Sequence, residues 1–193
     1  GILGFMAHPE LSAEQGGHSG NYVYMDQNAA LRWVHENIGA FGGDADQVVI
    51  AGQSFGAGSV AEQVLSPQSR GLFRGAMLSS SCNLTRENVS LAQGEKAGLE
   101  IQKRLGVKNL TEMRQMPADK ILALQAETQN LTVNAGITVP RIIDGAFIPT
   151  TKADALARKL GSQVPLLAGF NGDDNDSLPD RYPLSWAKTV AEY

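Results

Sequence analysis

The stretch VVIAGQSFGAGSV at residues 48–60 sets one serine, Ser54, between Gly52 and Gly56, directly after a short apolar run. β-Branched residues followed by Gly-x-Ser-x-Gly and a helical pattern predict a strand that turns sharply into a helix. Glycines on both sides leave room for the serine Oγ at the top of a sheet. The pattern predicts that Ser54 is a nucleophile, and the alternative is a polar residue in a tight turn.

The helix expected after Ser54 directs the N–H groups of its first turn toward the same place. The backbone N–H of Phe55, the next residue, is positioned to stabilise an oxyanion that forms on a carbonyl attacked by Ser54. Phe55 is therefore predicted to supply one donor of an oxyanion hole.

Strand and helix patterns alternate along the rest of the chain. Buried strands are expected at residues 2–6, 48–52, 75–81 and 164–170, and the β-branched run at 48–52 predicts burial on both faces of the sheet. Helices are expected at 26–38, 57–65, within 87–130 and at 152–161, and an extended connection at 139–149. Asp26 is expected to cap the first long helix and Gly161 to stop the last one. Because strand, helix and strand follow one another, the chain predicts an α/β fold with a mostly parallel sheet flanked by helices.

Composition excludes several classes of partner. The 193 residues are 42% hydrophobic and 19% charged, and the net charge of −4 arises from mixed signs without a basic block. This argues against a nucleic-acid partner, and no apolar run is long enough for a membrane-spanning helix. Cys82 is the single cysteine, so no disulfide forms within these residues. No metal or organic cofactor is expected, and the oligomeric state is left open.

A nucleophilic serine requires a general base, which is usually a histidine that a carboxylate orients. In this architecture the chain order is serine, acid, histidine. The three histidines, His8, His18 and His35, all precede Ser54. We expect His35 to lie in a helix and the other two in a loop, so the base is expected to lie outside these residues.

The acid is expected in the polar loop after residues 164–170, because catalytic groups gather at the carboxyl ends of parallel strands. The candidates in this loop are Asp173, Asp174, Asp176 and Asp180. Residue chemistry alone does not choose among them. A solvated acidic loop is the alternative, and the spacing matches no calcium-binding loop.

Residues 20–60, GNYVYMDQNAALRWVHENIGAFGGDADQVVIAGQSFGAGSV, resemble the signature region of the type-B carboxylesterase and cholinesterase-like family of α/β-hydrolases. GILGFMAHPELS, PRIIDGAFIP and VPLLAGFNGDDN resemble further landmarks of that family. The resemblance implies an α/β-hydrolase fold and cofactor-free hydrolysis of carboxylic esters through an acyl-enzyme on Ser54. It places Asp174 at the position of the family's acid, which is usually Glu.

Two departures from the family pattern lie beside the serine. Phe55 stands where members usually carry Ala, and its ring is able to narrow an acyl pocket while its backbone N–H remains a donor. Gln53 stands where many members carry Glu, so a negative charge is absent, which speaks against cationic choline-type substrates.

The resemblance also implies which parts of the family's catalytic domain residues 1–193 contain. The family's Gly-Gly oxyanion loop is expected upstream of Gly1 and its histidine downstream of Tyr193. Residues 1–193 are therefore expected to be an incomplete excerpt, the central part of one catalytic domain, with little or no turnover by themselves. The alternatives are a non-catalytic cholinesterase-like binding or adhesion protein and a thioesterase-like hydrolase on the same fold.

Five Asn-x-Ser/Thr triplets favour an exported protein, either secreted or periplasmic. They begin at Asn83, Asn88, Asn109, Asn130 and Asn175. Helix-cap and turn chemistry uses the same residue types and is the alternative.

Overall fold

The computed structural model describes residues 1–81, 84, 87–128, 139–172 and 174. Its helices are α1 (Ile2–Phe5), α2 (Pro9–Glu14), α3 (Tyr22–Asn37), α4 (Phe55–Leu65), α5 (Leu91–Leu105), α6 (Leu110–Gln115), α7 (Ala118–Thr128) and α8 (Lys152–Ala157). Single 3₁₀ turns lie at Ile38–Phe41, Ala45–Gln47 and Pro67–Ser69. The strands are β1 (Val49–Gln53), β2 (Gly75–Ser79), β3 (Val89–Ser90), β4 (Ile142–Ile143) and β5 (Leu166–Gly169).

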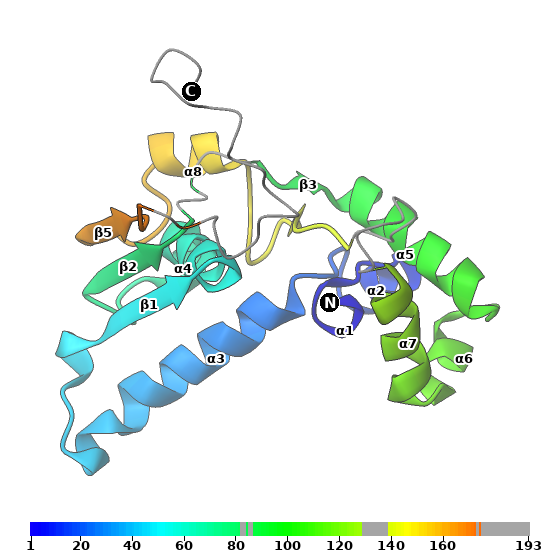
Figure 1. Cartoon of the computed structure of the whole chain (residues 1–193), viewed down its shortest axis with the longest axis horizontal. Helices are drawn as coiled ribbons and strands as arrows, with labels where there is room; N and C mark the ends of the chain where they lie inside the picture. The colour runs from blue at the N-terminus through cyan, green and yellow to red at the C-terminus, as the bar shows by residue number, and fades with distance from the viewer. Residues whose placement is uncertain (82–83, 85–86, 129–138, 173, 175–193) are drawn as a thin grey trace.

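A parallel sheet with the order β1-β2-β5 contains three of the four expected strands (Figure 1). In its register Gln53 lies opposite Ser79, and Ser79 lies opposite Gly169. The three strands therefore end at the same edge, which confirms the predicted parallel α/β architecture. A second, two-stranded parallel sheet pairs β3 with β4.

Helix α4 covers one face of this sheet. Ala57, Val60, Ala61 and Val64 of α4 pack on Ile50, Ala76 and Leu78 of the strands, with Phe73 beside them. This buried cluster fixes the start of α4 against the end of β1, the junction that contains Ser54.

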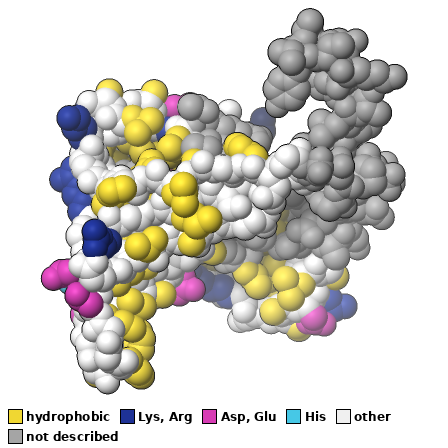
Figure 2. All heavy atoms as spheres, turned by 60° about the vertical axis from the view of Figure 1, so that its left-hand side comes forward, with side chains coloured by type: hydrophobic (Ala, Val, Ile, Leu, Met, Phe, Trp, Pro, Cys, Tyr) yellow, Lys and Arg dark blue, Asp and Glu magenta, His cyan; other side chains and the backbone are white. Residues whose placement is uncertain are grey.

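The expectation that the strands are buried on both faces is wrong for the described residues. Ile50 is the one buried residue of β1, and β5 is exposed along its length. Val49, Met77 and Leu167 are exposed on the face opposite α4. Hydrophobic side chains are visible on the side of the molecule where the sheet lies (Figure 2).

The opening residues form a helix, not the expected strand. In α1, Ile2 and Phe5 are the buried residues, three positions apart, which is helical spacing.

Two predicted helix ends are also wrong. Asn21, in the left-handed region at φ 56°, precedes α3, so Asp26 lies inside that helix. Helix α8 ends before Arg158, and Gly161 instead allows close packing, because an added Cβ would overlap the Val64 carbonyl.

A buried polar cluster ties the start of α3 to residues after β4. Asn21 Nδ2 donates to the Ile142 carbonyl at 2.7 Å and to Asp144 Oδ2 at 2.5 Å. Asp144 Oδ1 also accepts from the backbone N–H groups of Ala146, Phe147 and Ile148. Because these buried groups satisfy one another, the Asp-Gly turn is held in one geometry.

Two of the Asn-x-Ser/Thr asparagines have structural roles. Asn109 caps α6 by accepting from the Glu112 N–H at 2.9 Å, as the cap alternative predicts. Asn88 Nδ2 donates to both carboxylate oxygens of Glu62 at 3.3 Å. The triplets at Asn83, Asn130 and Asn175 lie outside the described residues.

Replacing Lys152 with Met should lower the free energy of unfolding by about 3–5 kcal/mol, because it leaves the Glu62 carboxylate buried without its cation. Lys152 Nζ lies 2.8 Å from Glu62 Oε1, and both side chains are 1% exposed. Urea unfolding measures the change. The matched control is Arg158→Met, at the residue directly after α8. Its exposed partner Asp154 lies 2.9 Å away, and loss of this pair should cost less than about 1 kcal/mol. Equal decreases in the free energy of unfolding of the two variants would contradict the conclusion that the buried Lys152–Glu62 pair matters more than the exposed one.

Candidate active site

Ser54 lies at the junction of β1 and α4 with φ 54° and ψ −118°. This conformation is rarely adopted by a residue other than glycine and costs on the order of 1–3 kcal/mol. Its N–H donates to the Ser79 carbonyl at 2.9 Å, and its carbonyl accepts from the Gly58 N–H at 3.2 Å. The backbone is thus bonded on both sides while the residue itself is exposed. The strained strand-to-helix turn predicted from the sequence is present.

The two flanking glycines differ in their roles. A Cβ at Gly52 would overlap the Gly56 carbonyl, so the chain turns back on itself too closely for any side chain there. A Cβ at Gly56 would meet no described atom within 4 Å. The close approach therefore requires glycine at position 52, whereas no described neighbour requires it at position 56.

The N–H of Phe55 belongs to the first turn of α4, whose N–H groups have no intrahelical acceptor. The helix dipole adds positive potential at this end. The arrangement is suited to stabilise negative charge beside Ser54, as expected for an oxyanion donor.

Asp174 lies after β5, at the edge of the sheet where Ser54 also lies. Its Oδ1 accepts from Ser80 Oγ at 2.8 Å and from Asn171 Nδ2 at 3.4 Å. Ser80 follows β2 directly, and its N–H donates to the Gly169 carbonyl at 2.8 Å. The end of β2 therefore lies between Ser54 and Asp174, which are not bonded to each other. The rival candidates Asp173, Asp176 and Asp180 lie outside the described residues.

The histidines do not approach Ser54 by any hydrogen bond in the described part of the chain. His8 is 1% exposed, and it is a helix cap, not the loop residue that was expected. Its Nδ1 accepts from the Glu10 N–H at 3.2 Å, and its Nε2 lies 2.6 Å from Gln102 Oε1. His35 lies on α3 and is exposed, in agreement with the helical prediction, and His18 lies in the loop before α3.

An aromatic cluster adjoins the strand-to-helix turn at Ser54, which we call the elbow. The Phe55 ring packs edge-to-face on Phe5 at 5.7 Å, and Phe5 packs in the same way on Tyr24 at 5.2 Å. Burial raises the pKa of the Tyr24 hydroxyl, the charge of Glu62 adds to the rise, and Arg141 opposes it. The guanidinium carbon of Arg141 lies 5.9 Å from the centre of the Phe55 ring. Phe55, the residue after Ser54, thus has an aromatic neighbour and a cationic one.

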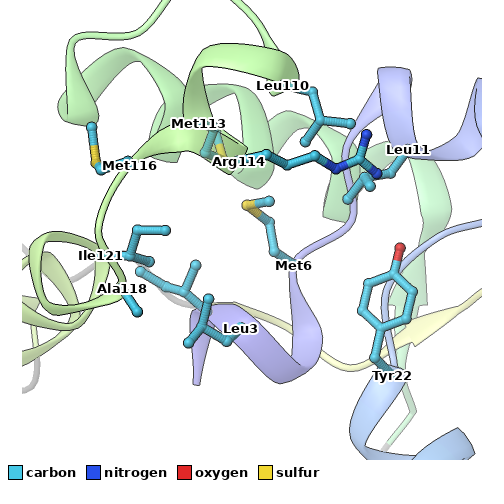
Figure 3. Close-up of a pocket in the computed structure, with 11 residues that line it drawn as sticks. Leu3, Met6, Leu11, Tyr22, Leu110, Met113, Arg114, Met116, Ala118 and Ile121 are labelled. Atoms are coloured by element: carbon cyan, nitrogen blue, oxygen red, sulfur yellow. The ribbon is translucent and has the colours of Figure 1, made fainter.

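A cavity of about 360 Å³ has a lining that does not include Ser54 or Phe55. Figure 3 shows the residues that line it. Its lining comes from α1, α2, α3, α6 and α7 and the turn before α7, and includes Met6, Met113 and Met116, with Arg114 and Tyr22 among the polar members. Neither β1 nor α4 contributes to it, so it holds no part of the candidate site. The described ranges contain no group of three or more His, Cys, Asp or Glu side chains suited to a metal ion.

Two residues of the site were missed from the sequence. Ser80 bonds Asp174, and the signal was the LSSS run at the end of a predicted strand. Arg141 reaches Phe55 from a segment distant in the chain, and no local pattern indicates that contact.

A parallel sheet with a strained serine at a strand-to-helix turn defines an α/β-hydrolase. Solved structures of esterases agree with this class. A carboxylesterase of Geobacillus stearothermophilus is 32% identical with a TM-score of 0.77, over 98% of this chain and 40% of that one. A structure described as PNB esterase is 30% identical with a TM-score of 0.74, over 92% of this chain and 38% of that one.

The chain belongs to the carboxylesterase family, whose model matches residues 1–183. Fumonisin B1 esterase of Sphingopyxis macrogoltabida is 37% identical over 198 residues, covering all of this chain and 35% of the relative. Acylcarnitine hydrolase of Mus musculus is 34% identical over 175 residues, covering 90% of this chain and 30% of the relative. The chain thus spans about a third of the length of these relatives. No helix in the described ranges has the length and apolar character needed to cross a bilayer.

Proposed function

We propose that the protein is a serine hydrolase of carboxylic esters that acts through an acyl-enzyme, with Ser54 as its nucleophile. The strained backbone of Ser54 carries this proposal, because a protein that only binds partners has no use for a serine held at φ 54° with its side chain exposed. Membership of the carboxylesterase family supports the ester as the reacting bond.

In the proposed reaction Ser54 Oγ attacks the ester carbonyl carbon while a base takes its proton. The N–H of Phe55 donates to the resulting oxyanion, and collapse of the tetrahedral intermediate expels the alcohol, to which the base returns the proton. Water then hydrolyses the acyl-enzyme by the same steps. No step of this proposed reaction requires a metal or an organic cofactor.

The proposed base is a histidine that Asp174 orients. His8, His18 and His35 do not take this place, and the relatives are about three times as long as these residues, so we propose that residues outside 1–193 supply it. Residues 1–193 are on this proposal the central part of one catalytic domain.

The direct test is hydrolysis of p-nitrophenyl hexanoate by the whole protein, followed by release of p-nitrophenolate. The expected result is steady turnover, preceded by a burst if deacylation is slower than acylation. A folded protein that releases no p-nitrophenolate and hydrolyses neither short esters nor the matching thioester would contradict the proposal and favour the binding or adhesion alternative.

A further inference from the structure

A cation forms part of the surroundings of the candidate nucleophile. Arg141 lies over the Phe55 ring at 5.9 Å, a distance at which a guanidinium and an aromatic face attract each other. Phe55 directly follows Ser54, and the residue is 52% exposed. The residue next to the candidate nucleophile therefore has an exposed aromatic ring with a guanidinium over its face.

The segment that carries Arg141 is held in place from both sides. The Arg141 carbonyl accepts from the Val89 N–H at 3.0 Å. The next residue, Ile142, is bonded through its N–H and its carbonyl to the buried side chain of Asn21. Such support keeps a charged group in position before a ligand arrives, which lowers the entropic cost of binding.

The charges around the elbow favour an anion. The residue before the nucleophile is the neutral Gln53. The amino end of α4 adds positive potential. Asp174 lies at the same edge of the sheet and is assigned to the proposed triad.

We propose that Arg141 determines specificity by binding a carboxylate of the substrate, so that the protein prefers esters with an anionic group a few atoms from the reacting carbonyl. A guanidinium forms paired, charge-assisted hydrogen bonds with a carboxylate, which a neutral or aliphatic group cannot replace. This inference rests on the proposed esterase function and names the substrate class for the same site.

The test compares p-nitrophenyl hexanoate with the mono-p-nitrophenyl ester of adipic acid, which has the same chain length but ends in a carboxylate. The ester of hexanoic acid with 4-hydroxybenzoate places the carboxylate on the alcohol half instead. The measured quantity is the ratio of kcat/KM for each anionic ester to that for the neutral one, because a loss of folded protein cancels within one variant.

Arg141→Gln should lower this ratio by about tenfold or more for at least one anionic ester, since it removes a charge-assisted contact. Arg141→Lys should keep part of the preference. The anionic ester whose ratio falls in Arg141→Gln shows whether the acyl half or the alcohol half of the substrate carries the anion. The control is Arg114→Gln, whose partner is Glu14 and which should leave the ratio unchanged.

Two outcomes overturn the inference, and they are distinguishable. If the wild-type protein hydrolyses the hexanoate ester but Arg141→Gln changes neither ratio by more than about twofold, Arg141 does not set specificity while the esterase function stands. If the wild-type protein hydrolyses none of the three esters, the proposed function itself fails, and the inference fails with it.

Discussion

Ser54→Ala should lower kcat for p-nitrophenyl hexanoate by on the order of 10⁵ to 10⁶, because no acyl-enzyme forms without the nucleophilic oxygen. The variant should remain folded. Ser54 is exposed, and the hydrogen bonds that hold it are those of its backbone, which alanine retains. Alanine at φ 54° bears the same strain as serine, so the free energy of unfolding should change little.

A matched control distinguishes the loss of the Ser54 nucleophile from the effect of removing any serine hydroxyl near the elbow. Ser59 lies on α4, the helix that begins directly after Ser54, and its hydroxyl donates to the Phe55 carbonyl at 3.3 Å. Ser59→Ala should keep kcat within a few-fold of the wild-type value. Retention of more than about a tenth of the wild-type rate in Ser54→Ala would show that another residue attacks the ester.

Asp174→Asn should lower kcat by about 10³ to 10⁴, since the amide no longer stabilises a protonated histidine and favours the wrong tautomer. The change keeps the size of the side chain, and its carbonyl oxygen is still able to accept from Ser80 Oγ. The thermal midpoint should therefore change far less than the rate. Steady-state kinetics and thermal unfolding of the same sample measure both.

The control for Asp174 is Asp176, two positions later in the acidic stretch of the sequence. Asp176→Asn should leave kcat within a few-fold of the wild-type value. If Asp176→Asn abolished turnover and Asp174→Asn did not, the acid would have been assigned to the wrong residue, although Ser54 would be unaffected.

The part of the fold that surrounds Ser54 was predictable because its signals are local. A β-branched run, a glycine that permits a close turn and a helical pattern follow one another within residues 48–65, and the structure confirms the strand, the turn and the helix. The parallel pairing of β1 with β2 followed from the order of elements.

The failures have non-local or ambiguous causes. The apolar residues at positions 2–6 fit a strand or a helix equally by composition, and only the spacing of Ile2 and Phe5 distinguishes them. Burial on both strand faces was inferred from hydrophobicity, but α4 covers one face in the described residues. Arg141 contacts Phe55 across 86 positions of the chain, and no local pattern predicts this contact. The LSSS run marks Ser80 as a polar residue at a strand end, but it does not predict the bond to Asp174 across 94 positions.

Covalent trapping tests whether Ser54 is the nucleophile. The whole protein is treated with a fluorophosphonate, digested and mapped by mass spectrometry, because such probes react with an activated serine Oγ. We expect one adduct, on Ser54, in the wild-type protein and none in Ser54→Ala. An unlabelled Ser54, or an adduct on another serine that persists in Ser54→Ala, would contradict it.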